Sequence, residues 1–237
     1  MPHLQSAVAR TITPLYRPLR ERVGKAIYAP GAKLRTEGVI HLEELSLAGA
    51  DRIRYKALGW SVLPRILSAR EVSDDDVFID YGSGMGRLLY IAAARYPFRR
   101  VIGLELSEQL NEIARANLGR NAHRLRCSDI QLHTGDVLEY EPPPDITVAF
   151  FNNPFTGKTF ETAVERLLDA AQRPLRIIYC NPIEHEVLMA TGRLEVVRRL
   201  RGWRPGQAWS RSNTTIMYRT LPGRAGGGAG KGSRAST

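Results

Sequence analysis

The 237-residue sequence has few cysteines and no long run of apolar residues. Cys127 and Cys180 are its only cysteines, and they lie far apart, so we expect no disulfide framework and a reducing, cytoplasmic setting. No apolar stretch approaches the roughly 20 residues that span a bilayer, and no apolar signal-peptide block is seen, so we expect no membrane partner. An Arg-rich, acid-poor N-terminus leaves a transit peptide as an alternative. The apolar fraction of 43% is sufficient for a full core.

The formal net charge of +10 lies mostly at the two ends of the chain. Residues 1–36 contain seven basic side chains and one acid, Glu21, and residues 221–237 add three basic side chains and no acid. We therefore expect a nearly neutral folded body. A basic end that binds an acidic partner such as a nucleic acid is possible, but a solvated terminus is favoured.

Composition divides the chain into four predicted parts. Residues 1–36 are a basic N-terminal arm, irregular with one short helix, and residues 37–72 are a helical extension. In that extension the helical pattern runs from Leu42 to Ala69, with a break near Gly59 and with Pro64 placed to start a helix. Residues 73–221 form the main domain. Residues 222–237 are a Gly-rich tail with too little apolar surface to order, and we expect it to be disordered.

Strand and helix patterns alternate through the main domain, which is typical of a parallel sheet. The predicted strands are Val77–Asp80, Val101–Glu105, Ile130–Thr134, Ile146–Phe151 and Leu175–Cys180, and the predicted helices begin at Arg87, Glu108, Thr159 and Glu184. Ser107 is a plausible N-cap for the second of these helices. Two further strands, Leu194–Leu200 and Thr214–Tyr218, have no helix-length segment between them, so they should be antiparallel neighbours.

A glycine-rich loop follows the first strand, where residues 80–87 read Asp-Tyr-Gly-Ser-Gly-Met-Gly-Arg. Gly82, Gly84 and Gly86 allow backbone angles closed to other residues and let a ligand approach the main chain. The helix that begins at Arg87 points its free amides at the same place. The glycine spacing departs from the G-x-G-x-x-G fingerprint of dinucleotide sites, so it favours S-adenosylmethionine over NAD.

Acids follow the next two predicted strands as well. Glu105 ends one, where a carboxylate can accept both hydroxyls of a ribose. Asp136 follows the other, where its side chain and the backbone at Val137 can receive an adenine amino group. The carboxyl ends of parallel strands meet at one edge of the sheet, so Asp80, Glu105 and Asp136 predict a single cofactor site. Polar strand ends without a ligand are the alternative.

With these motifs, the sequence resembles class I S-adenosylmethionine-dependent methyltransferases over roughly residues 60–220. Residues 80–86 match that family's first motif, Glu105 its ribose-binding acid and Asp136 its adenine-side acid. The resemblance implies an α/β fold with a doubly wound, mostly parallel seven-stranded sheet, an antiparallel last strand, helices on both faces, an N-terminal helical extension and no metal. The cofactor contacts that it implies are Asp80, Tyr81, Gly82, Ser83, Gly84, Gly86, Glu105, Leu106, Asp136, Val137 and Asn152.

The fourth strand ends in Asn-Asn-Pro-Phe at residues 152–155, where a class I methyltransferase places its substrate. This segment is similar to the Asn-Pro-Pro-Phe motif of amino-group methyltransferases and to the Asn-Asn-Phe segment of non-SET histone-lysine methyltransferases. A carboxamide oxygen can accept hydrogen bonds from an amine and so orient its lone pair. We expect Asn152, Asn153 and Phe155 to face the acceptor. A strand-terminating turn with Phe155 in the core is the alternative.

Other residues near the expected site are open to two interpretations. His185, after a second Asn-Pro at residues 181–182, is either a general base or a surface histidine beside a helix-capping Glu184. Four aromatic residues either cover the cofactor and substrate or serve only packing: Tyr55, Trp60, Trp203 and Trp209.

The sequence therefore predicts a cytoplasmic methyltransferase that uses S-adenosylmethionine and in-line displacement. An amine nitrogen of a protein lysine or a small molecule is the favoured acceptor. The alternatives are a small-molecule O-methyltransferase with His185 as base, a nucleic-acid methyltransferase that uses the basic arm, a non-catalytic S-adenosylmethionine-binding module or partner subunit, and, least favoured, a dinucleotide oxidoreductase.

Overall fold

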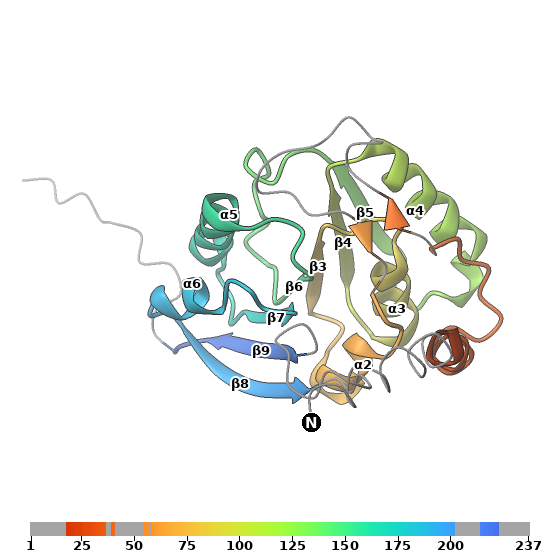
Figure 1. The fold of residues 1–237 in the computed structure, drawn as a ribbon, viewed down its shortest axis with the longest axis horizontal. Coiled ribbons are helices and arrows are strands. Elements are labelled where there is room, and N and C mark those ends of the chain that lie inside the picture. Colours follow the sequence, from red (N-terminus) through yellow and green to blue (C-terminus); the bar gives the residue numbers. More distant parts are fainter. Residues whose placement is uncertain (1–17, 37–38, 41–54, 57, 202–213, 223–237) are drawn as a thin grey trace, which may run out of the picture.

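The computed structural model describes residues 18–36, 39–40, 55–56, 58–201 and 214–222 (Figure 1). Seven strands form one sheet in the order β5-β4-β3-β6-β7-β9-β8. Their bounds are β3 Val77–Tyr81, β4 Arg100–Glu105, β5 Asp129–Thr134, β6 Val148–Phe151, β7 Arg176–Cys180, β8 Leu194–Arg201 and β9 Thr214–Thr220. Strand β9 runs antiparallel to both of its neighbours, and the other six strands share one direction. The predicted sheet with its reversed last strand is confirmed.

Helices connect the parallel strands, as the alternating pattern predicts. Helix α3 (Arg87–Arg95) joins β3 to β4, α4 (Glu108–Arg120) joins β4 to β5, α5 (Gly157–Ala170) joins β6 to β7, and α6 (His185–Ala190) joins β7 to β8. The short elements α2 (Val62–Ile66) and η2 (Ala69–Glu71) precede the sheet, and η3 (Ala122–Arg124) follows α4. Ser107 caps α4 as predicted, because its hydroxyl accepts the backbone N–H of Leu110.

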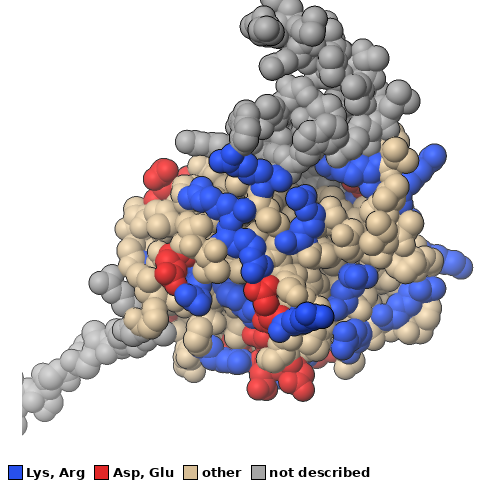
Figure 2. Space-filling model, turned by 90° about the horizontal axis from the view of Figure 1, so that it is seen from below, with Lys and Arg blue, Asp and Glu red and all other residues tan. Residues whose placement is uncertain are grey.

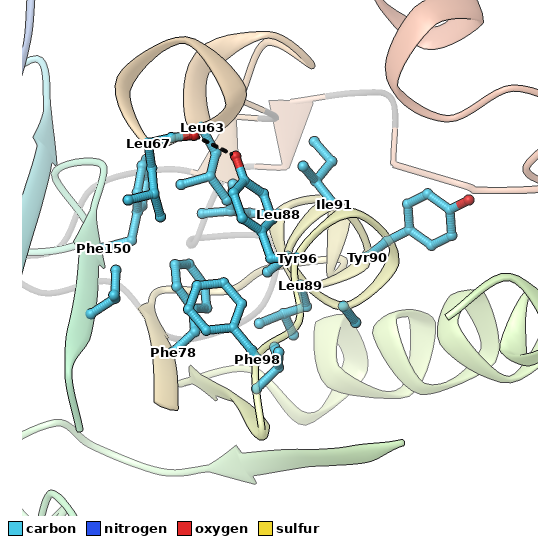
Figure 3. Close-up of a cluster of buried hydrophobic side chains, with 14 of the residues drawn as sticks. Leu63, Leu67, Phe78, Leu88, Leu89, Tyr90, Ile91, Tyr96, Phe98 and Phe150 are labelled. Atoms are coloured by element: carbon cyan, nitrogen blue, oxygen red, sulfur yellow. Dashed lines mark hydrogen bonds between the residues drawn. The ribbon is translucent and has the colours of Figure 1, made fainter. Parts of the chain in front are cut away.

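Successive side chains of each strand enter two different cores, because the pleat sends them to opposite faces of the sheet. One core lies under α2 and α3 and takes Phe78, Val101, Val148, Phe150 and Ile178 from the strands; the other lies under α5 and takes Ile79, Ile102, Ala149, Phe151 and Ile177. Figure 3 shows the first core, where the hydroxyl of Tyr96 donates to the backbone carbonyl of Leu67 at 2.9 Å. Burial on both faces explains the continuous apolar run at the start of β3.

The N-terminal extension differs from the helical pattern predicted for residues 42–69. Residues 41–54 lie outside the described part, Tyr55–Lys56 forms strand β2, and this strand pairs antiparallel with β1 (Val39–Ile40). Among the described residues of this range, the α-helical part is α2, in which Pro64 is the third residue rather than the first. Proline is tolerated there because the first amides of a helix have no partner within it. A two-residue strand depends on a partner distant in the sequence, which a local pattern cannot reveal.

Cys127 and Cys180 are buried and form no disulfide. Within the described ranges, no helix is long and apolar enough to cross a membrane. No group of three His, Cys, Asp or Glu side chains that could hold a metal ion occurs there either. The division of the chain at residues 36, 72 and 221 stays a prediction, and residues 223–237 of the tail lie outside the described part.

Candidate functional site

The glycine-rich loop joins β3 to α3 in a conformation that requires glycine. Gly82, Gly84 and Gly86 have φ angles of 77°, 53° and 76°, in the left-handed region. A Cβ on Gly82 would lie 2.5 Å from the Cβ of Pro154, and a Cβ on Gly86 would lie 2.9 Å from that of Ala114. At Gly82 and Gly86 the backbone and the surrounding space therefore both exclude a side chain. The close approach of Gly82 to Pro154 also means that the loop packs against the turn that follows β6.

Glu105 lies at the end of β4 with both carboxylate oxygens fixed by the backbone. Oε2 accepts the N–H of Gly84 at 2.8 Å, and Oε1 accepts the N–H of Ser107 at 3.0 Å. Each oxygen keeps a second lone pair, so this oriented carboxylate can still accept two hydroxyl groups. Burial raises the pKa of Glu105, and the backbone amides of Ser107, Gly84 and Leu106 oppose that shift.

Asp80, the fourth residue of β3 and close to the loop, is 5% exposed. Burial, and then the charge of Glu105, raises the pKa of Asp80 well above its ordinary value of 3.8. No described residue donates a hydrogen bond to its carboxyl group. A buried carboxylate without donors is costly, so this position favours a ligand that brings positive charge or N–H groups.

The end of β5 lies beside that of β4, because the N–H of Gly135 donates to the carbonyl of Glu105 at 3.0 Å. Asp136 follows immediately, and its Oδ1 accepts the N–H of Leu138 at 3.0 Å, which shapes the turn. Val137 in that turn is buried. The structure thus brings the three predicted acids to the carboxyl ends of three adjacent strands.

The remaining predicted cofactor residues lie in or beside the same loop. Ser83 is buried, and its hydroxyl has no hydrogen-bond partner among the described residues. Tyr81 is also buried and stacks on Phe151, with ring centres 4.6 Å apart. Leu106 is half-buried after β4. Gly103 in β4 was not singled out from the sequence, yet a Cβ there would lie 2.8 Å from the Ser83 hydroxyl.

These residues fit S-adenosylmethionine. The buried Ser83 hydroxyl in the loop has no partner among the described residues, and Glu105 retains lone pairs for ribose hydroxyls. The uncompensated Asp80 suits the cationic methionine end. The roles of these residues in binding stay predictions.

Three asparagines and Tyr179 form a hydrogen-bonded cluster, the asparagine clasp, that links the ends of β6 and β7. The hydroxyl of Tyr179 donates to Asn153 Oδ1 at 2.7 Å, and Asn153 Nδ2 donates to the Asn181 carbonyl at 2.7 Å. Asn181 Nδ2 in turn donates to Asn152 Oδ1 at 3.0 Å. Asn153 and Asn181 both precede proline and have φ angles of 50° and 55°, which asparagine tolerates better than most residues.

The clasp has a chemical consequence at the predicted acceptor site. Each carboxamide oxygen has two lone pairs and receives one hydrogen bond within the clasp, so Asn152 and Asn153 can each accept one more. Sequence reasoning did not assign Tyr179 and Asn181 to this site. The repeated Asn-Pro at two strand ends was the signal that could have found Asn181.

Phe155 lies in an aromatic cluster behind the loop. It is 7% exposed and meets the rings of Tyr81 and Phe151 edge-on, with centres 6.4 and 6.2 Å away. It therefore occupies the core position that the sequence left as an alternative. Contact with the acceptor stays a prediction for this residue.

His185 has both ring nitrogens engaged. Nδ1 lies 2.7 Å from the Tyr218 hydroxyl oxygen, and Nε2 lies 3.1 Å from the guanidinium of Arg199. A guanidinium only donates, so Nε2 must accept, and the proton resides on Nδ1. This arrangement leaves no nitrogen free to act as a general base.

Trp60 packs instead of covering the site. It is 3% exposed, and the guanidinium carbon of Arg87 lies 4.3 Å from the centre of its ring. The side chain of Tyr55 and the residues Trp203 and Trp209 lie outside the described part.

Arg87, the first residue of α3, anchors the N-terminal segment from inside the protein. It is 4% exposed, and its Nε and Nη2 donate to the side chain and carbonyl of Thr36 at 2.9 and 3.1 Å. Its Nη1 donates to Glu21 and to the carbonyl of Leu58, each at 2.8 Å. The sequence predicted Arg87 only as a helix start.

Two asparagines of α4 and its C-terminal end continue this attachment by pairing with the backbone of residues 33–35. Asn121 accepts the N–H of Lys33 and donates to its carbonyl, at 3.0 and 3.1 Å. Asn117 does the same with Arg35, at 2.8 and 2.9 Å, and also donates to the carbonyl of Met85 at 2.9 Å. The extended segment is thus held beside the glycine-rich loop. Asparagines spaced four residues apart on a helix were the available signal.

Comparisons with known proteins agree with this geometry. Residues 50–196 match the family described as histone methylation protein DOT1. The chain is 29% identical over 90 residues to a protein-lysine N-methyltransferase of Saccharolobus islandicus, which covers 38% of this chain and 54% of that relative. It is 28% identical over 124 residues to a tRNA1(Val) (adenine(37)-N6)-methyltransferase of Vibrio campbellii, which covers 48% of this chain and 47% of that relative.

The chain therefore spans about half the length of these two relatives. Among solved structures, it is similar to a proposed RNA methyltransferase from Pyrococcus horikoshii, with a TM-score of 0.55 and 16% identity over 86% of this chain and 97% of that chain. This last likeness concerns the fold. The family match over more than half of the chain, together with the seven-stranded sheet and its reversed last strand, shows that the protein belongs to the DOT1 family of histone methylation proteins and has the fold of class I S-adenosylmethionine-dependent methyltransferases.

Proposed function

We propose that the protein is an S-adenosylmethionine-dependent methyltransferase that methylates an amine nitrogen, with a protein lysine as the favoured acceptor. One observation carries the proposal: the glycine-rich loop (residues 80–87), here called the cofactor loop, and the turn at residues 152–155, here called the asparagine turn, are in direct contact. Gly82 and Pro154 lie so close that no Cβ fits between them. A methyl group held by the loop would therefore lie next to the carboxamides of Asn152 and Asn153.

The carboxyl edge of the sheet would hold the cofactor in three parts. Asp80 and the loop from Tyr81 to Gly86 would hold the methionine portion, Glu105 and Leu106 the ribose, and Asp136 and Val137 the adenine. When bound, the cofactor supplies a methyl group on a sulfonium, which is already a good leaving group. The protein has then to align the acceptor and exclude water, and alignment alone can supply much of the rate.

The acceptor side would be formed by carboxamide oxygens that cannot rotate freely. Tyr179 and Asn181 hold the side chains of Asn153 and Asn152, as described above. Their remaining lone pairs can accept the N–H groups of an amine and turn its own lone pair toward the methyl group. Tyr179 and Asn181 are positioning residues in this scheme.

An amine fits this site better than a hydroxyl. A hydroxyl acceptor must give up its proton to a base as it is methylated, and both nitrogens of His185, the candidate base, are engaged. The relatives support nitrogen as well, since one is named for a protein lysine and the other for the N6 of an adenine. The DOT1 match favours lysine between these two.

The test is to incubate the purified protein with methyl-labelled S-adenosylmethionine and cell extract, and to separate protein, RNA and small molecules. We expect label in protein, recovered as methyl-lysine after hydrolysis. Asn152→Ala should lose about 100-fold in rate at saturating cofactor, because a displaced acceptor group has an effect of this size. His185→Gln is the matched control and should keep the rate.

The other outcomes distinguish the alternatives. Label on an RNA adenine would replace lysine by a nucleic-acid amine, and label on oxygen that is lost in His185→Gln would establish an O-methyltransferase. Cofactor binding with label in no fraction would contradict enzymatic function and favour a binding module.

A further inference from the structure

The loops that follow β6 and β7 are joined by one carboxylate, that of Glu184. Its Oε1 accepts the N–H of Gly157, the first residue of α5, at 2.8 Å. Glu184 is the N-cap residue of α6, yet its side chain makes no hydrogen bond to that helix. It caps α5 instead, whose own N-cap residue Thr156 makes no side-chain hydrogen bond. The two helices lie side by side, as Figure 1 shows.

Glu184 is also connected to the asparagine clasp. Its backbone N–H donates to the hydroxyl oxygen of Tyr179 at 3.4 Å, and that hydroxyl donates to Asn153 Oδ1 at 2.7 Å. One phenol oxygen therefore separates Glu184 from a carboxamide that is proposed to face the acceptor. Burial raises the pKa of Tyr179, and the negative charge of Glu184 raises it further, so the carboxylate is close enough to act on the clasp.

The carboxylate of Glu184 can accept more hydrogen bonds than the protein gives it. The amide of Gly157 uses one lone pair of Oε1, and no residue in the described part of the chain donates to Oε2. Among the described residues, no cationic side chain forms an ion pair with Glu184. Lys158, which follows Gly157, pairs with Glu161 at 2.9 Å instead. The negative charge beside the clasp is therefore without a cation.

The overall charge of the chain does not favour a cationic acceptor. The formal net charge is +10, and Lys and Arg predominate on the face that Figure 2 shows. Like charges repel at long range, so a cation has to be attracted by an acid at the site itself. Glu184 is such an acid, next to the asparagine turn.

We propose that Glu184 binds the ammonium group of a cationic acceptor such as a lysine side chain, and thereby selects it over a neutral amine such as that of an adenine. This inference rests on the proposed function, which assigns the acceptor to the asparagine turn. An ammonium group has three N–H donors, and three acceptor oxygens meet here: Asn152 Oδ1, Asn153 Oδ1 and Glu184 Oε2. The amino group of an adenine has only two donors and no charge.

The role of Glu184 belongs to binding, before methyl transfer. An ammonium group must release one proton to solvent before its nitrogen can attack the methyl group. The two N–H groups that remain match the carboxamides of Asn152 and Asn153, which align the amine in the proposed function. Glu184 is therefore a specificity-determining residue, and its effect should be measurable as binding in the absence of transfer.

The experiment compares two small probes of equal length on the full chain saturated with S-adenosylhomocysteine. One is n-butylamine, an alkyl ammonium at about pH 7, and the other is neutral n-butanol. The NMR signals of the Asn152 and Asn153 carboxamides report binding at the asparagine turn. We expect n-butylamine to bind at least about tenfold more tightly, because hydrogen bonds to charged groups have effects of this size.

The test variant is Glu184→Gln, because its carboxamide oxygen can still accept the N–H of Gly157 while the charge is lost. It should bind n-butylamine no more tightly than n-butanol. The matched control is Glu165→Gln, which removes the same charge from an exposed position on α5. It should keep the preference of the unmodified protein for n-butylamine.

Equal binding of the two probes by the unmodified protein would overturn the proposal, and so would a preference that survives in Glu184→Gln. Equal loss in the two variants would overturn it too, because only net charge would then act. Should Glu184→Gln fail to fold, the carboxyl carbon signal of Glu184 in the unmodified protein must shift along the same n-butylamine binding curve as the carboxamides, and an unmoved signal would count against the proposal. Methyl transfer plays no part in these measurements, so failure of this proposal leaves the proposed enzymatic function untouched.

Discussion

Replacing Gly82 by alanine should force the cofactor loop away from the asparagine turn at residues 152–155. A left-handed φ of 77° costs an alanine about 1–2 kcal/mol. The new Cβ would lie 2.5 Å from that of Pro154, so one segment must move, and overpacking of this kind costs about 1–3 kcal/mol. We therefore expect the free energy of unfolding to fall by about 2–5 kcal/mol.

The displaced loop should also bind the cofactor less well. If about 1.4 kcal/mol of the strain falls on the bound state, the affinity for S-adenosylmethionine drops tenfold. Titration calorimetry measures that affinity, and urea unfolding measures the stability. Gly119→Ala is the matched control, since a Cβ there meets nothing within 4 Å. It should leave affinity unchanged and raise the free energy of unfolding by about 0.5–1 kcal/mol, because alanine favours the helix.

Wild-type affinity together with a stability change below about 0.5 kcal/mol in Gly82→Ala would refute this reasoning. The loop and the asparagine turn would then not be in contact, and the central observation behind the proposed function would no longer hold.

Two further predictions follow from buried charges. Arg87→Gln should lower the free energy of unfolding by about 3–5 kcal/mol, because it leaves the buried carbonyl of Thr36 and the partly buried carbonyl of Leu58 unpaired. Amide exchange at residues 33–36 should then accelerate. Exposed Arg95→Gln on the same helix is the control, and an equal effect there would contradict the anchoring role. The raised pKa of Asp80 means that the folded protein keeps a proton that the unfolded chain has released, so the stability contributed by Asp80 falls as pH rises above about 4 through the raised pKa. A cationic cofactor favours the ionised carboxyl, so affinity for S-adenosylmethionine should fall as pH is lowered through the same window; calorimetry at several pH values should show this dependence flattened in Asp80→Asn, and an unchanged profile would contradict the assignment.

The cofactor edge was predictable because its signals are local. A buried strand, three glycines and an acid at each strand end occupy short windows, and the sheet rule alone brings the strand ends together. The observed strands differ from the predicted ones by one or two residues at their ends, as for β6, which begins at Val148 rather than Ile146. Such shifts left every predicted acid at the carboxyl edge.

The asparagine turn was predictable only in part. Asn152 and Asn153 were predicted from their place after a strand, but the side chains that hold them come from β7 and the turn after it, more than 25 residues further on. Whether a carboxamide is fixed or free depends on its neighbours across the sheet. The hydrogen bonds of His185 could not be predicted for the same reason, because Tyr218 lies in β9 and Arg199 in β8.

The distribution of charge shows most clearly what the sequence could predict and what it could not. Counting along the chain predicted a nearly neutral body with basic ends, whereas residues 18–36 are folded onto α3 and α4 through Arg87, Asn117 and Asn121. The sequence by itself determined the fold class and the cofactor edge, because both arise from periodicity and strand ends. Only the tertiary structure decided the attachment of residues 18–36 to α3 and α4 and the asparagine clasp, because these depend on hydrogen bonds between segments that no local pattern joins.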